Sequence, residues 1–100
     1  MARAIEITTF KLKSGFGIDD FVKANSDVDP WLRRQRGFVS RTMVERSDGT
    51  IVDMVIWESA AEAEDSAQRL MRELASSPVH SVIDERTVSW SIGRIFRQSA

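Results

Sequence analysis

Two polar residues occupy positions where the surrounding pattern favours apolar side chains. Asn25 falls on a helical stripe with Phe21 and Val28, at spacings of three and four residues. Asp53 lies in the middle of residues 51–58, a β-like apolar segment in which acids are disfavoured. A carboxylate held in a pocket can act as a general base, and an amide beside it can bind a substrate.

Each residue also has a structural interpretation. Asn25 could hydrogen-bond to a backbone carbonyl freed near a kink at Pro30, because buried polar groups are usually paired locally. Asp53 could form an ion pair with Arg41 or Arg86, or lie exposed at a sheet edge. Both alternatives stay open at this point.

The Asp48-Gly49 dipeptide is a strong hairpin signal, and a two-residue turn there sets a strand register. That register gives the pairs Val44 with Asp53, Thr42 with Val55 and Ser40 with Trp57. It places Asp53 on one face with Ser40, Thr42 and Trp57, so Trp57 could stack on a bound ring. The site prediction therefore takes Asp53 and Asn25 as catalytic residues. As substrate-binding residues it takes Trp57, Thr8, Ser40, Thr42 and Phe21.

The elements that must position these side chains follow from breakers and periodicity. Strands are predicted over residues 3–13, 38–46, 51–58 and 85–96. A helical pattern starts at Ile18 and should break near residues 27–29, with Asp29 capping a short second helix and Gly37 ending the segment. Ser59 and Glu62 form a capping box that opens a long helix, and residues 78–83 form a helical turn.

The resulting order is β-α-β-β-α-β, which predicts an α+β, ferredoxin-like fold with a four-stranded antiparallel sheet and helices on one face. Residues 51–58 alternate Val52, Met54 and Ile56 with Asp53, Val55 and Trp57, so both faces of this strand are mostly apolar. One face can pack on the helices. The other needs a partner, and the simplest partner is a second copy of the chain, which predicts a homodimer.

The composition of the chain argues against several classes of function. One hundred residues predict one domain over residues 1–100. The absence of cysteine and the single histidine, His80, argue against thiolate or histidine-rich metal sites and against a cysteine nucleophile. A net charge of -1 argues against nucleic-acid binding. No bilayer-length apolar run or signal peptide is apparent, so we expect a cytoplasmic protein without a membrane partner.

The segment from Gly37-Phe38 through the hairpin to Trp57-Glu58-Ser59 resembles the dimeric α+β barrel superfamily, in particular its antibiotic-biosynthesis-monooxygenase group. The resemblance covers nearly the whole chain in topology and residues 37–67 in motif. It implies a dimeric barrel with a pocket between sheet and helices. It also implies cofactor-independent oxidation of an aromatic substrate that supplies its own electrons to oxygen.

Haem-degrading members of this superfamily carry an Asn in strand one, a Trp in helix two and a His after it. At the matching positions this chain has Thr8 and no Trp between Ala60 and Ser89, and His80 falls a few residues before the ligand position. No cofactor is therefore expected. Three hypotheses remain: a cofactor-independent oxygenase acting on a small aromatic or polyketide-like molecule, a non-enzymatic ligand-binding or stress-related dimer, and a structural dimer whose interior is filled by its own side chains.

Overall fold

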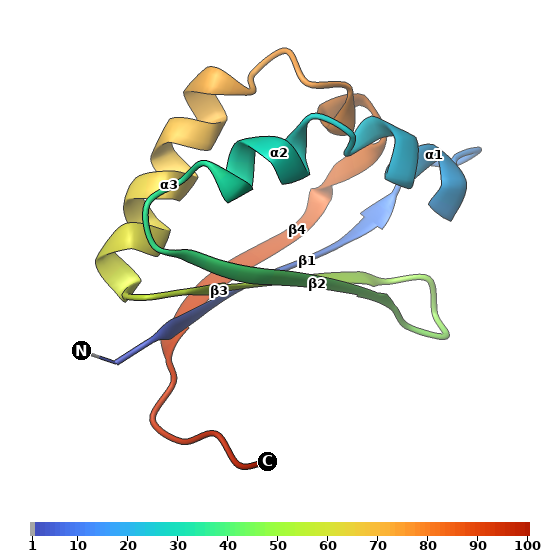
Figure 1. Cartoon of the computed structure of the whole chain (residues 1–100). Helices are drawn as coiled ribbons and strands as arrows, with labels where there is room; N and C mark the ends of the chain where they lie inside the picture. Colours follow the sequence, from blue (N-terminus) through green and yellow to red (C-terminus); the bar gives the residue numbers. More distant parts are fainter. Residues whose placement is uncertain (1) are drawn as a thin grey trace.

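A four-stranded antiparallel sheet in the order β2-β3-β1-β4 forms one layer, and the helices lie on one of its faces (Figure 1). The computed structural model describes residues 2–100. The elements are β1 (Ala4–Leu12), α1 (Ile18–Ala24), α2 (Val28–Arg33), β2 (Phe38–Glu45), β3 (Ile51–Trp57), α3 (Ala60–Glu73), the 3-10 turn η1 (Pro78–Ser81) and β4 (Ile83–Arg94). The predicted ferredoxin-like fold is confirmed.

The helical segment after β1 breaks close to the predicted place, but the second helix starts earlier than predicted. α1 ends at Ala24 and α2 begins at Val28, with Asp27 and not Asp29 at its N-cap. Pro30 therefore sits in the first turn of α2, where its missing N–H removes no intrahelical hydrogen bond. β4 also begins and ends two residues before its predicted limits, because Ile83 already pairs with Leu12.

α3 begins where the capping pattern predicts. The Ser59 hydroxyl oxygen accepts a hydrogen bond from the Glu62 backbone N–H (3.3 Å) and donates to the Glu62 carboxylate (3.0 Å). This cap satisfies one of the free N–H groups at the start of the helix. It fixes the point at which the chain leaves β3 and crosses the sheet.

The β2–β3 hairpin has a three-residue loop, so the register predicted from a two-residue turn is wrong. The Arg46 N–H donates to the Thr50 carbonyl (2.8 Å), the Gly49 N–H donates to the Arg46 carbonyl (2.9 Å), and Gly49 has a φ of 87°. A turn followed by a left-handed residue adds one residue to the loop. Asp53 consequently pairs with Met43 and Val55 with Arg41. A shift of one residue exchanges the two faces of β2.

The two faces of the sheet differ in their surroundings. The face toward the helices carries the buried residues Ala4, Phe10, Ile51, Val55 and Trp57. The opposite face carries Ile5, Ile7, Val52, Met54 and Ile56, and Figure 1 shows no helix over it. The predicted two-sided apolar character of β3 is confirmed.

Gly37 tests the contact between the start of β2 and α3, because its φ is 85° and a Cβ there would collide with the Glu62 carboxylate. Gly49 is a matched control, since its φ is 87° but a Cβ would meet nothing within 4 Å. We expect Gly49→Ala to lower the free energy of unfolding by about 1–2 kcal/mol through backbone strain alone. Gly37→Ala should cost about 0.5–1.5 kcal/mol more, because the displaced Glu62 carboxylate loses its hydrogen bond from Ser59. Urea denaturation measures both, and equal losses would contradict the Glu62 contact.

Candidate functional site

A cavity of about 740 Å³ lies between the helix-facing side of the sheet and the elements α1, α2, α3 and η1. Its walls are mainly apolar, with Phe10, Val55, Leu70 and Val79 among the lining residues. Two hydrogen-bonded groups of polar side chains lie on its wall, one around Arg41 and one around Glu6. Apolar walls with a few convergent polar groups are typical of small-molecule sites.

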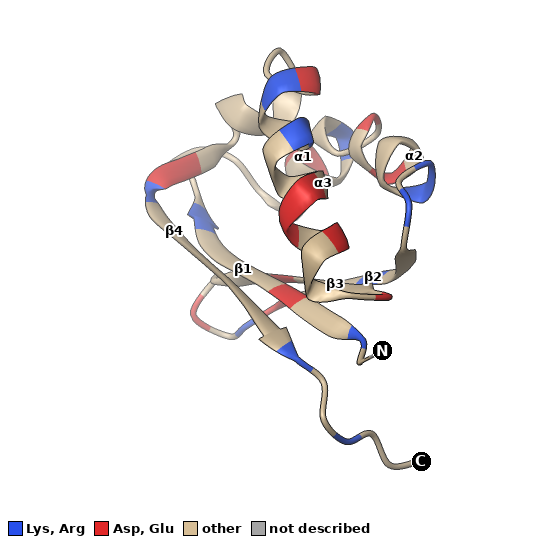
Figure 2. Cartoon of the chain, turned by 90° about the vertical axis from the view of Figure 1, so that its left-hand side faces the viewer, with Lys and Arg blue, Asp and Glu red and all other residues tan. Residues whose placement is uncertain are grey.

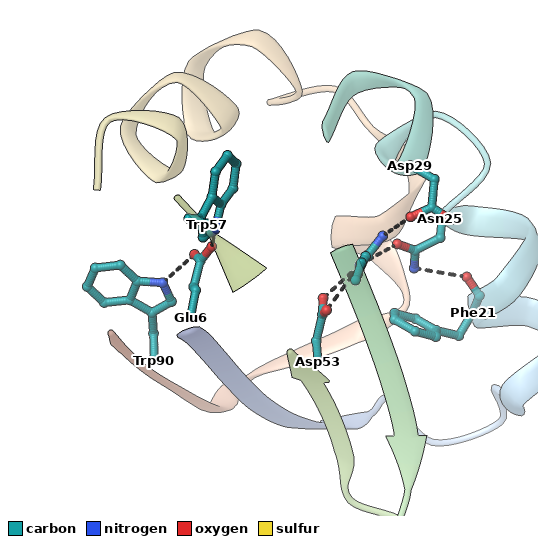
Figure 3. A network of polar contacts seen from close by, with 8 residues as sticks. Glu6, Phe21, Asn25, Asp29, Asp53, Trp57 and Trp90 are labelled. Atoms are coloured by element: carbon teal, nitrogen blue, oxygen red, sulfur yellow. Dashed lines mark hydrogen bonds and ion pairs between the residues drawn. The ribbon is translucent and has the colours of Figure 1, made fainter. Parts of the chain in front are cut away.

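The first group centres on the Arg41 guanidinium, whose side chain is 8% exposed. Arg41 donates to both carboxylate oxygens of Asp53, at 3.0 Å from Nε and 2.7 Å from Nη2. It also donates to Asp29 Oδ1 (2.8 Å) and to Asn25 Oδ1 (2.9 Å). Asn25 in turn donates from Nδ2 to the Phe21 carbonyl (3.2 Å; Figure 3). Four hydrogen bonds therefore hold the guanidinium between β3, α2 and the end of α1.

Burial acts to lower the pKa of Arg41, but the hydrogen bonds and charges of Asp53 and Asp29 outweigh it and raise that pKa above its ordinary value. Because the folded-state pKa is raised, the stability from these contacts is fully present below the ordinary pKa of an arginine and is lost only as the pH rises through the raised value. Arg41 is therefore a permanent cation.

The second group centres on Glu6 of β1. Its Oε1 accepts from the Trp57 indole N–H (3.0 Å), and its Oε2 accepts from the Trp90 indole N–H (2.7 Å). Figure 3 shows this carboxylate between the two indoles, apart from the group formed by Asp53, Asn25 and Asp29. Glu6 is half-buried and lines the cavity.

The structure brings four of the predicted site residues to the cavity wall. Asn25, Asp53, Thr8 and Phe21 all line it. Asp53 faces the helices and not the opposite side of the sheet, which the convergence of Asn25 and Asp53 required. The ion-pair alternative for Asp53 is confirmed with Arg41 as the partner. The local carbonyl bond expected for Asn25 is also present, with Phe21 as its acceptor.

The other three predicted site residues lie elsewhere. Trp57 shares the helix-facing side of β3 with Asp53, but it is 0% exposed and packs edge-on against Phe38, so it lies behind the cavity wall. Its contact with the site is through Glu6. Ser40 and Thr42 are exposed on the opposite face of β2, because the three-residue hairpin loop turns Arg41 and Met43 toward the helices instead.

Sequence reasoning missed Glu6 and Trp90 and placed Arg41 on the wrong face. Glu6 carried the same signal as Asp53, since it is an acid within the strand-like run from Ala4 to Phe10. Trp90 shares one face of β4 with Ile92, as the alternation of side chains along a strand predicts, and the two residues lie opposite Thr8 and Glu6 of β1. His80 lies in η1 and lines the cavity, with Nε2 2.8 Å from the Leu74 carbonyl oxygen.

Residues 2–100 contain no group of three or more His, Asp or Glu side chains placed to hold a metal ion. Within the same residues, no helix is both long and apolar enough to cross a membrane.

Comparison with known proteins shows the fold. No protein-family model matches this sequence, and no curated protein matches it. Among solved structures, SnoaB, a cofactor-independent oxygenase from Streptomyces nogalater, has a TM-score of 0.68 at 14% identity, covering 100% of this chain and 97% of SnoaB. The chain has the fold of the antibiotic-biosynthesis-monooxygenase-like proteins.

Two further structures give the same result. A Bordetella bronchiseptica protein assigned as an antibiotic biosynthesis monooxygenase has a TM-score of 0.77 at 17% identity, over 100% of this chain and 99% of that one. A protein from Shewanella loihica PV-4 assigned as a monooxygenase has a TM-score of 0.72 at 17% identity, over 97% of both chains. The resemblance noted from the sequence is thus confirmed at the level of the fold.

The Arg41 group predicts a specific order of stabilities. Arg41→Met keeps the aliphatic stem but leaves the Asp53 carboxylate, which is 16% exposed, without its cation, and should cost about 3–5 kcal/mol of unfolding free energy. Asp53→Asn keeps the volume and one acceptor and should cost about 1–3 kcal/mol. Chemical denaturation measures both.

The matched control is Arg86→Met, because the Arg86 side chain is 90% exposed in its pair with Asp84 and should change stability little. An Arg41→Met protein as stable as the Arg86→Met protein would contradict a structural role for the Arg41 group.

Proposed function

We propose that the cavity binds a small, mainly apolar aromatic molecule and that the protein oxidises this molecule with molecular oxygen, without a bound cofactor. The observation that carries the proposal is the cavity itself. Its volume of about 740 Å³ is within the range of small-molecule sites and far above that of a self-filled interior. The presence of SnoaB, a cofactor-independent oxygenase, among proteins of the same fold supports the reaction class.

The chemistry balances without an external reductant. Loss of the hydroxyl proton from a phenol leaves an electron-rich ring that can transfer electrons to O2, and the new C–O bond gives a hydroperoxide. Loss of water then leaves a quinone, so one O2 places one oxygen atom in the quinone and the other in water. The protein must bind the ring, exclude bulk water and accept or orient the hydroxyl proton.

The Arg41 group suits orientation better than proton transfer. Both oxygens of Asp53 accept hydrogen bonds from the guanidinium, so this carboxylate is already engaged in an ion pair. Asn25 contributes an amide, which binds and does not act as a base. We therefore propose that Asp53 and Asn25 fix one wall of the cavity through Arg41.

The oxygenase proposal predicts oxygen uptake in the presence of substrate and protein alone. With a panel of one- to three-ring phenols and a metal chelator, an oxygen electrode should record one O2 consumed per quinone formed. Ala67→Trp fills the cavity from α3 and should lower the rate at least about tenfold, whereas Ala61→Trp, on an exposed part of the same helix, should leave it unchanged.

Binding of phenols without oxygen uptake would favour a non-enzymatic ligand-binding protein. Neither binding nor uptake across the panel would contradict the proposal as a whole.

We also propose that the protein is a homodimer that packs sheet against sheet. The sheet face opposite the helices carries Ile5, Ile7, Val52, Met54 and Ile56, and burying such a face is favourable in proportion to its apolar area. A second copy presents the same surface, which is the requirement for a two-fold symmetric interface.

The dimer predicts a sedimenting species of twice the 11.3 kDa chain mass at micromolar concentration. Met54→Lys places a charge in the centre of the apolar face and should yield the single-chain species, because an unpaired buried charge is costly. Ala61→Lys, at an exposed position of α3 on the helix side of the sheet, should keep the dimer. A wild-type protein that sediments only at 11.3 kDa would rule the dimer out.

A further inference from the structure

Glu6 is a carboxylate in unusual surroundings for its position. Its cross-strand neighbours are Val55 on β3 and Ile92 on β4, both apolar. None of the ion pairs formed within residues 2–100 includes it. Its hydrogen-bond partners there are the indole N–H groups of Trp57 and Trp90, one on each oxygen. The carboxylate is thus oriented by two neutral donors and faces the cavity.

The two indoles leave acceptor capacity on Glu6. An ionised carboxylate has about four lone-pair sites, and the indoles occupy two of them. The Trp57 ring is fully buried, so it fixes one oxygen rigidly, whereas the Trp90 ring is 49% exposed and lies on the cavity wall. A hydrogen-bond donor on a ligand can therefore bind the Glu6 carboxylate, which is already held in place, while the rest of the ligand lies beside the Trp90 ring.

The charges around the cavity also favour a ligand that donates a hydrogen bond over a ligand that is an anion. The lining residues include four carboxylates, those of Glu6, Asp53, Glu64 and Glu85. Figure 2 shows acidic positions on β1, on α3 and at the start of β4. The one Lys or Arg among the lining residues that the structure describes is Arg41, whose guanidinium already makes four hydrogen bonds. An anionic ligand would meet repulsion and find no free cation to pair with.

We propose that Glu6 is the specificity-determining anchor of the cavity: it accepts a hydrogen bond from a hydroxyl or protonated amino group on an aromatic ligand, and it excludes aromatic carboxylates. This inference rests on the proposed ligand-binding function and adds the class of ligand. The unshared lone pairs of Glu6 bind the donor, Trp90 contacts the ring, and the negative lining repels anions. The buried Trp57 acts as the positioning residue that holds the carboxylate in place.

The test uses three matched probes that differ only in the polar group on a naphthalene ring. They are 2-naphthol, 2-naphthylmethylamine and 2-naphthoate, with binding measured by calorimetry at pH 7 under nitrogen. The hydroxyl and ammonium probes should bind at least about tenfold more tightly than the carboxylate, as a hydrogen bond to a charged group allows. Glu6→Gln should remove most of this difference.

Glu85→Gln removes one of the four lining charges and should weaken the repulsion of 2-naphthoate by much less than Glu6→Gln does, with the order of affinities kept, which separates a specific anchor from general charge. If Glu6→Gln does not fold, Trp90→Phe decides, because this exposed ring can be replaced while the carboxylate remains. The order of the three probes should survive in Trp90→Phe.

Loss of the order in Trp90→Phe would assign the selectivity to the indole and overturn the proposal. Tight binding of 2-naphthoate to the unaltered protein would also overturn it, while leaving the cavity as an aromatic site. Failure of all three probes to bind would overturn both this inference and the proposed binding function.

Discussion

The buried Arg41 guanidinium is the interaction on which the arrangement of the site depends. It links Asp53 on the sheet to Asp29 on α2 and to Asn25 at the end of α1. Removing a charge from water costs several kcal/mol, and this cost is offset only where close partners satisfy the donors. Arg41 meets that condition with three partners from different elements. The break between α1 and α2 is therefore tied to the sheet at one point on the cavity wall.

The Arg41 guanidinium spans the break between the two helices, because it contacts Asn25 at the end of α1 and Asp29 in α2. Asn25 caps α1 with its backbone and uses both ends of its side-chain amide, donating to the Phe21 carbonyl and accepting from Arg41. Asn25 and Asp29 are four residues apart, a spacing that would also place both side chains on one face of a continuous helix. The guanidinium therefore bridges the two short helices across the break and ties both of them to the sheet.

The sequence predicted the element order, the helix break and the cap of α3, because these depend on local signals such as Pro30, Ser59 and the alternation in β3. Asp53 and Asn25 were also identified as polar residues within apolar patterns, and the structure brings them together around Arg41. What the sequence could not decide was whether Arg41 or Arg86 pairs with Asp53, or whether Asp53 lies exposed. Loop length at Gly49 decides whether Arg41 or Thr42 faces the helices, and the dipeptide signal suits both a two- and a three-residue loop. The burial of Trp57 depends on Phe38 and α3, which is tertiary information.

The three-residue hairpin loop has a consequence for how this protein can change over generations. Loops usually tolerate insertions and deletions, since they lie on the surface. Here a two-residue turn could still join Arg46 to Thr50, so the loss of one loop residue would keep Arg41 opposite Val55 and its guanidinium under the helices. A residue lost from β2 between Arg41 and Arg46 would instead turn Arg41 to the uncovered side of the sheet, because side chains alternate between the two faces. The chemistry of the site therefore depends on the length of this part of the strand more than on the length of the turn.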